Sequence, residues 1–127
     1  MASILKVDDL RGNTAAGNIT ITSEGGSATM QLQQGVAKAW NNTNNTGTTI
    51  NDSFNISSLT DTDTGKQKHN VTNSFNSANH VPTFSIDNNI DQEWTWDLTT
   101  SKWATAVYTG SAYYDSSVRT VSHGDLA

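Results

Sequence analysis

The sequence predicts a mainly β protein, an antiparallel β-sandwich or small barrel with an N-terminal strand arm and one short helix. Three observations support this fold class. Short segments that alternate polar and apolar residues recur at roughly ten-residue spacing between turn residues, as in small antiparallel domains. The chain contains 19 Thr, which favour strands. Its 14 Ser and 14 Asn favour the turns between strands.

The arm is expected at residues 1–45 and the antiparallel β-domain at residues 46–127. The polar, turn-rich stretch Asn41–Gly47 marks the boundary between them. Within the arm, Ile4–Val7 and Asn18–Thr22 are the expected short strands. Two strands of this length bury little surface by themselves, so the arm is not expected to form a domain.

The segment Ala28–Trp40 is predicted to be a helix rather than a strand. Its apolar residues Leu32, Val36 and Trp40 recur at four-residue spacing, which places them on one helix face. Gly35 lies within this segment and costs about 1 kcal/mol relative to Ala. Because such a stripe can line the symmetry axis of a small oligomer, Leu32, Val36 and Trp40 are candidate subunit-interface residues. Alternatively, the stripe packs on the sheet.

The stretch Phe54–Asn79 has the pattern of a β-hairpin. Asp61–Gly65 supplies the turn, because its side-chain oxygens bond the local backbone and its glycine tolerates positive φ. The return strand is expected over Gln67–Thr72. We expect Phe54–Leu59 to be buried and the polar Lys66–Asn70 to face solvent or a neighbouring subunit, at the rim of the sheet.

Four further segments complete the predicted β-domain: His80–Ile86, Glu93–Leu98, Lys102–Thr109 and Tyr113–Ser122. Pro82 lacks a backbone donor, which suits an edge strand or a bulge.

The supply of aliphatic residues is small for a chain of this length. Leu, Ile, Val and Phe together number 23 of 127 residues, below the roughly 20% expected of a self-sufficient core. The net charge of −5 is too low to indicate disorder by itself. A β protein that completes its core by oligomerising fits these values, and the aromatic residues favour it over a disordered polar chain.

The sequence offers no recognisable catalytic, metal or cofactor site. There is no cysteine, so disulfides and thiolate metal sites are excluded. His69, His80 and His123 lie far apart, without ligand spacing. Asp61–Gly65 resembles the start of a calcium loop, but the twelfth position is Thr72 instead of glutamate. We therefore expect a non-enzymatic protein without a cofactor.

Nucleic acid and membrane are not expected partners. The seven Lys and Arg residues are scattered along an acidic chain, which argues against general nucleic-acid binding. No apolar stretch follows Met1 and no apolar run approaches 18 residues, so neither a signal peptide nor a membrane span is expected.

Clustered aromatic residues near the C-terminus are the feature that points to recognition. Exposed aromatic clusters bind sugars, peptides or partner proteins. The alternative is that they form the core, because Trp94, Trp96 and Leu98 alternate as residues on one strand face do. The candidate contacts to a partner or glycan are Trp94, Trp96, Trp103, Tyr113 and Tyr114.

Four stretches carry a resemblance to a known family. They are Ser3–Gly26, Leu32–Trp40, Gly47–Gly65 and the terminal HGDLA. Together they resemble virion proteins of marine tailed bacteriophages, which include tail-fibre proteins and other small appendage proteins. The most specific part is DSFNISSLTD, residues 52–61. The resemblance implies a homotrimeric β-structured protein on the particle surface, without catalytic activity.

This resemblance also implies where the protein acts and what it contacts. Assembly takes place in the bacterial cytoplasm, and the partners are the chain itself, other virion proteins of the tail or capsid, and a host surface receptor. The opening LKVDDLRG, residues 5–12, is similar to fibres that attach through their N-terminus, which favours a short tail fibre or tail appendage. The absence of long shaft repeats favours a capsid decoration (cement or knob) protein. A third alternative is a carbohydrate-binding module that uses Trp94, Trp96 and Trp103.

Overall fold

The computed structural model describes residues 4–15, 18–23, 25–44, 46–86 and 92–127. The chain divides into two units, Met1–Val36 and Ala37–Ala127. The division falls earlier than residues 45/46, because Ala39–Thr43 is a strand of the second unit.

The N-terminal unit contains a small hairpin and one helical turn. Its strands β1 (Thr20–Thr22) and β2 (Thr29–Gln31) pair antiparallel, and α1 (Leu32–Gly35) follows directly. The Leu32 amide donates to the Ile19 carbonyl at 2.8 Å. None of the described residues of this unit is buried.

The helix predicted over Ala28–Trp40 is wrong in its extent. Of the predicted segment, only α1 (Leu32–Gly35) is helical, and it lies between β2 and β3 (Ala39–Thr43). Gln31 makes no side-chain capping bond, and the backbone at Val36 is extended, so α1 ends at Gly35. The following residues instead form backbone bonds with two neighbouring strands. Leu32, Val36 and Trp40 therefore do not form one helical stripe.

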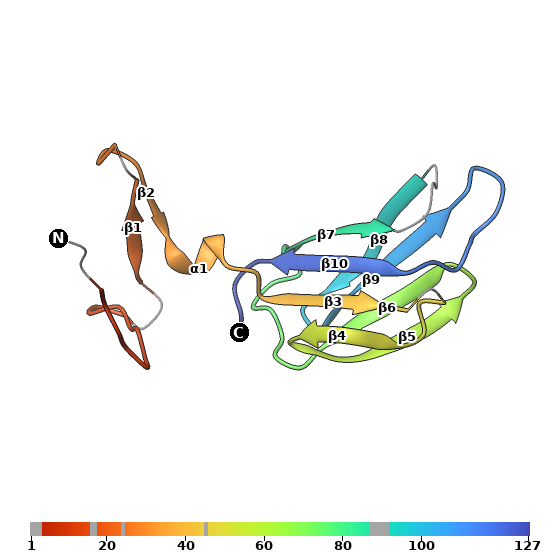
Figure 1. The fold of residues 1–127 in the computed structure, drawn as a ribbon, viewed down its shortest axis with the longest axis horizontal. Coiled ribbons are helices and arrows are strands. Elements are labelled where there is room, and N and C mark those ends of the chain that lie inside the picture. The colour runs from red at the N-terminus through yellow and green to blue at the C-terminus, as the bar shows by residue number, and fades with distance from the viewer. Residues whose placement is uncertain (1–3, 16–17, 24, 45, 87–91) are drawn as a thin grey trace. The chain divides into compact units, whose positions relative to one another are not determined.

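The C-terminal unit is a β-sandwich of two antiparallel sheets (Figure 1). In the described residues, one sheet has the order β4 (Ile50–Phe54), β3, β10 (Val118–His123), β7 (Val81–Ile86). The other has the order β5 (Ile56–Asp63), β6 (Lys66–Val71), β9 (Lys102–Tyr108), β8 (Gln92–Thr99). The mainly β, antiparallel prediction is confirmed. Pro82 lies in β7, an edge strand that pairs with β10 on one side only in the described residues. An edge strand tolerates a residue without a backbone donor, because its open side has no ladder to interrupt.

The core between the sheets depends on aromatic and small polar residues. Phe75 and Trp103 are almost fully buried, with Ala39 and Val71 packed beside them. The Trp103 indole N–H donates to Thr120 Oγ1 on the facing sheet at 3.2 Å. Hydroxyl groups bonded in this way allow a chain poor in aliphatic residues to fill a core without orphaned polar groups at these positions.

The hairpin of β5 and β6 is confirmed, but the expected burial of its two strands is reversed. Strand β5 is at an edge and mostly exposed, and Phe54 belongs to β4, with 53% of its surface exposed. Strand β6 is paired on both sides, so its alternation buries Gln67, His69 and Val71. A polar strand is therefore central because of its position in the sheet.

A β-bulge interrupts β8 at Asp97. This residue has φ of +50°, and the pairing with β9 shifts register between Trp96 and Thr99. The bulge reverses the alternation, so Leu98 packs against the core cluster. The expectation that Leu98 shares a face with Trp94 and Trp96 is therefore wrong.

Candidate functional site

The candidate site is the outer surface of the second sheet, called here the aromatic face. It comprises Lys66, Lys68, Trp94, Trp96, Asp97, Lys102, Tyr108 and Tyr113. Strand register brings these residues together from separate parts of the chain.

Two rows of cross-strand partners build the centre of this face. Ala106 of β9 is opposite Lys66 on one side and Trp94 on the other. Ala104 is opposite Lys68 and Trp96 in the same way. Both alanines are fully buried. Their small side chains leave room for the longer side chains that flank them.

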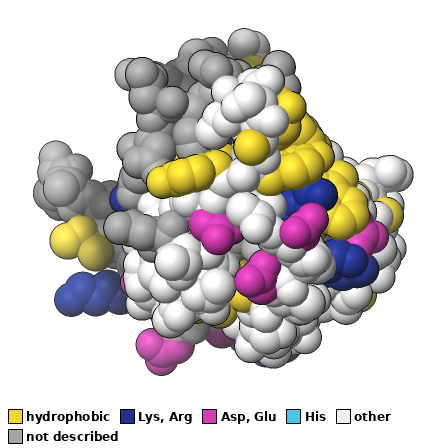
Figure 2. Space-filling view, turned by 90° about the vertical axis from the view of Figure 1, so that its right-hand side faces the viewer, with side chains coloured by type: hydrophobic (Ala, Val, Ile, Leu, Met, Phe, Trp, Pro, Cys, Tyr) yellow, Lys and Arg dark blue, Asp and Glu magenta, His cyan; other side chains and the backbone are white. Residues whose placement is uncertain are grey.

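Three aromatic rings contact one another at one end of the face. The centroid of Trp94 is 5.9 Å from that of Tyr108 and 5.7 Å from that of Tyr113. The Tyr108 and Tyr113 centroids are 5.3 Å apart, with planes at 65°. Trp94 keeps 36% of its surface exposed. Figure 2 faces the end of the sandwich where β9 ends, and shows hydrophobic side chains gathered beside basic and acidic ones.

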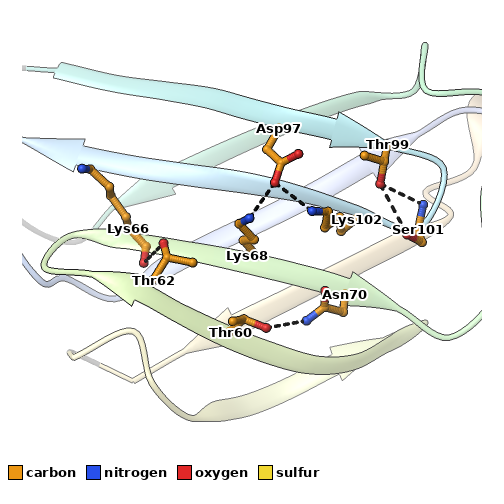
Figure 3. Close-up of polar contacts among 9 residues, drawn as sticks. All are labelled: Thr60, Thr62, Lys66, Lys68, Asn70, Asp97, Thr99, Ser101 and Lys102. Carbon is orange, nitrogen blue, oxygen red and sulfur yellow. Dashed lines mark hydrogen bonds and ion pairs between the residues drawn. The ribbon is translucent and has the colours of Figure 1, made fainter.

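A charge cluster on the same face joins Asp97 to Lys68 and Lys102 (Figure 3). Asp97 Oδ2 is 2.7 Å from Lys68 Nζ and 2.8 Å from Lys102 Nζ. The hydrogen bonds from Lys102 and Lys68 lower the pKa of Asp97. The hydrogen bond to Asp97 raises the pKa of Lys68. One carboxylate is therefore shared by two ammonium groups, which leaves this cluster with net positive charge.

Lys66 connects the rings to an open hollow. Its Nζ lies 3.9 Å from the centroid of the Tyr113 ring, a cation–π geometry, and 3.4 Å from Asp63 Oδ2. Lys66, Trp94, Trp96 and Tyr113 line a hollow of about 310 Å³. The face therefore combines partly exposed rings, a concave surface and a cation.

The structure separates the five aromatic residues expected to form a contact surface. Trp94, Trp96 and Tyr113 line the hollow together, and Tyr114 is 50% exposed nearby in sequence. Trp103 is fully buried in the core, where no ligand reaches it. The lysines and Asp97 were not anticipated. The spacing of Lys66 and Lys68 is a signal for a shared strand face, but it does not reveal the neighbouring strand.

The outer surface of the first sheet carries a second apolar feature, the Trp40 row. Phe54, Trp40, Val121 and Thr83 are successive cross-strand partners over β4, β3, β10 and β7. A shallow hollow of about 510 Å³ lies over β3, β10 and β7. Of the three candidate interface residues, Trp40 lies here, whereas Leu32 and Val36 belong to the N-terminal unit.

Within the described part of the chain, no three His, Cys, Asp or Glu side chains are grouped to hold a metal ion. No helix in the same residues is long and apolar enough to cross a membrane. The chain matches no protein-family model, no curated protein and no solved structure. The chemistry that the aromatic face offers is recognition by ring stacking and charge.

Proposed function

We propose that the chain is a non-enzymatic structural protein of a bacteriophage particle, a homotrimeric surface appendage of the tail. The N-terminal unit attaches to another virion protein, and the β-sandwiches contact one another through the Trp40 row. The sequence resemblance to marine phage virion proteins supports this role. The observation that carries it is the exposure of apolar side chains in the N-terminal unit.

The N-terminal unit lacks the means to cover its own apolar side chains. Its exposed large apolar residues are Ile4, Leu5, Val7, Leu10, Ile21, Met30 and Val36. Ile4 and Leu5 are 78% and 77% exposed. An isolated two-stranded hairpin is at best marginally stable, and a concentration of exposed apolar residues marks an interaction surface. Attachment to a second protein would bury these residues.

The Trp40 row supports contact between copies of the sandwich. Phe54 is 53% exposed at the end of this row, and Val81 on β7 is 60% exposed on the same sheet face. Subunit interfaces are enriched in aromatic residues at their centres. Each copy presents this apolar surface on a paired sheet, which is a rigid support for an interface.

The mass of the protein in solution tests the assembly. We expect light scattering to give three times the chain mass of 13.7 kDa. Phe54→Glu should shift the protein to monomer, because it places a charge in the proposed interface. Tyr114→Glu is the matched control, since Tyr114 is similarly exposed at 50% but lies outside the Trp40 row. A folded wild-type monomer at all concentrations would overturn the trimer.

Copy number on purified particles distinguishes the tail role from capsid decoration. Quantitative mass spectrometry against the major capsid protein should give a handful to a few dozen chains per particle for a tail appendage. Hundreds of chains would support the capsid alternative instead. Absence of the protein from purified particles would contradict both roles.

A further inference from the structure

We propose that the aromatic face is a binding site for an acidic glycan, with a pyranose ring stacked on Trp94 and a sugar carboxylate beside Lys66. The site consists of residues from one chain, so it exists whether or not three copies assemble. Its arrangement of rings, hollow and cations carries the proposal.

The aromatic rings of this face are not needed for the core. Trp103, Phe75 and His80 fill the core beneath, where Trp103 is fully buried. Trp94, in contrast, lies on the opposite side of its sheet and stays 36% exposed. Tyr108 and Tyr113 contact its ring at 5.9 and 5.7 Å between centroids. This contact orients the Trp94 indole before any ligand arrives, which lowers the entropy cost of binding.

The hollow has the size and lining for a small polar ring. Its volume of about 310 Å³ is at the lower end of the roughly 300–1,000 Å³ found for ligand pockets. Trp94 and Trp96 supply π faces, while Lys66 supplies a donor at the rim. A pyranose presents C–H groups on its ring faces and hydroxyl groups around its edge. It therefore matches a site with aromatic walls and polar groups at the margin.

The charges of the face select an acidic sugar over a neutral one. Three of the five lysines of the chain, Lys66, Lys68 and Lys102, lie on this face, although the chain as a whole has a net charge of −5. Asp97 is shared between Lys68 and Lys102, and Lys66 has only the exposed Asp63 at 3.4 Å as its ion-pair partner in the described residues. Exposed pairs of this kind are weak. A ligand carboxylate can therefore replace Asp63 beside Lys66 at little cost.

Single-stranded nucleic acid also stacks on aromatic side chains, but the charges here favour a glycan. Nucleic-acid binding uses basic grooves that follow several phosphates. The acidic chain provides one small basic cluster, already partly neutralised by Asp97. This cluster suits one or two carboxylates instead of a phosphate backbone.

Titration of the full chain with short glycans tests the site. The probes are hexasaccharides of galacturonate, guluronate and hyaluronate, and binding is followed by calorimetry. We expect saturable binding to at least one of them, with one site per chain. The methyl ester of the tightest binder should bind about tenfold more weakly, since esterification removes the negative charge of the carboxylate. Higher salt should also weaken binding to the acid.

Two variants locate the site, and one serves as a control. Trp94→Ala should lower the affinity about tenfold or more, because it removes the stacking surface. Lys66→Met keeps an unbranched side chain over Tyr113 and removes the charge, so the acid and its methyl ester should bind alike. Asp52→Ala, on the other sheet and outside the Trp40 row, should bind like wild type. Far-ultraviolet circular dichroism confirms that each variant is folded.

Several outcomes would overturn the proposal. These are no saturable binding of any of the three acids, equal binding of acid and methyl ester by wild type, or wild-type affinity in Trp94→Ala. Tighter binding of oligo(dT) than of every glycan would assign the face to nucleic acid instead. The oligomeric mass is measured on the same samples, so loss of glycan binding is distinguished from loss of assembly.

Discussion

His69 and His80 are buried in the sandwich, and both are held by hydrogen bonds that suit the neutral ring. His69 Nε2 is 3.0 Å from Thr105 Oγ1, and its ring stacks on Trp103 at 5.3 Å between centroids. His80 Nε2 donates to the Thr99 carbonyl at 2.9 Å, while its Nδ1 lies 2.8 Å from Ser122 Oγ. Burial lowers the pKa of His69 to about 3 and also lowers the pKa of His80.

These two residues predict acid sensitivity. Both pKa values are lower in the folded state than the ordinary value of 6.5. Below pH 6.5 the unfolded chain therefore binds more protons than the folded chain, which favours unfolding. The stabilisation that these neutral histidines give the fold is fully present above pH 6.5. For His69, it decreases as the pH falls from 6.5 to about 3. For His69, each pH unit in this range should cost up to about 1.4 kcal/mol. Urea unfolding at pH 7.5, 6 and 5 measures this slope.

Substitution of His69 separates its contribution from general acid effects. His69→Gln should flatten the pH dependence of the free energy of unfolding, although the variant is less stable at neutral pH. Gln67→Asn is the control, because Gln67 is buried on the same strand face and does not titrate. It should lose stability without a change of slope. An unchanged slope in His69→Gln would contradict the assignment.

The turn between β5 and β6 depends on Gly65. This residue has φ of +67°, and its amide donates to Asp115 Oδ1 at 2.6 Å. The amide of Val107 in turn donates to the Gly65 carbonyl at 2.9 Å. These bonds join the hairpin tip to the end of β9 and to the loop that carries Tyr113. The turn therefore supports one end of the aromatic face.

Gly65→Ala should strongly destabilise the sandwich. An added Cβ would lie 2.6 Å from the Tyr114 nitrogen and 2.8 Å from the Val107 oxygen. Left-handed backbone by itself costs an L-residue about 1–2 kcal/mol, and backbone atoms cannot move aside cheaply. We expect a loss of about 2 kcal/mol or more in urea unfolding. Gly25→Ala, where a Cβ meets nothing within 4 Å, is the matched control. Equal stability of both variants would contradict this role for the turn.

Local patterns predicted most strands, but pairing decided which strands were buried. The expected segments lie within one residue of β6, β7 and β9 at each end, and Asp61–Gly65 indicated the turn between β5 and β6. The polar composition of β6 predicted exposure, yet ladders on both sides place it in the sheet interior. Similarly, the spacing of Leu32, Val36 and Trp40 fits a helix, but long-range pairing of β3 prevails over it.

Only part of the aromatic face could be predicted from the sequence, because long-range strand pairing brings its residues together. Trp94 and Trp96 stand two residues apart, so a shared strand face was predictable. Lys66 and Lys68 lie far from them in sequence and join them through β9, which pairs with both β6 and β8. Lysines that look scattered along the chain are gathered by this register. Without the pairing of strands, the sequence could not distinguish Trp103, in the core, from Trp94.

The two units of the whole molecule differ in how they are stabilised. The sandwich has its own core around Trp103 and Phe75, and its sheets are linked by the bond from Trp103 to Thr120. The N-terminal unit buries none of its described residues. This contrast assigns folding stability to the sandwich, whereas the exposed apolar residues of the N-terminal unit are available for the attachment that we propose.

Removal of residues 1–36 should therefore leave a folded sandwich that no longer attaches to the particle. The shortened chain, Ala37–Ala127, keeps every strand of both four-stranded sheets. Its free energy of unfolding should match that of the full chain within about 1 kcal/mol, because no buried residue of the described N-terminal unit is lost. Urea unfolding measures this, and light scattering should still give a trimer.

The attachment of the shortened chain is tested separately. When each chain is added to particles that lack the protein, only the full chain should bind in a sedimentation assay. An unfolded shortened chain would show that the arm belongs to the fold, and equal binding of both chains would place attachment on the sandwich.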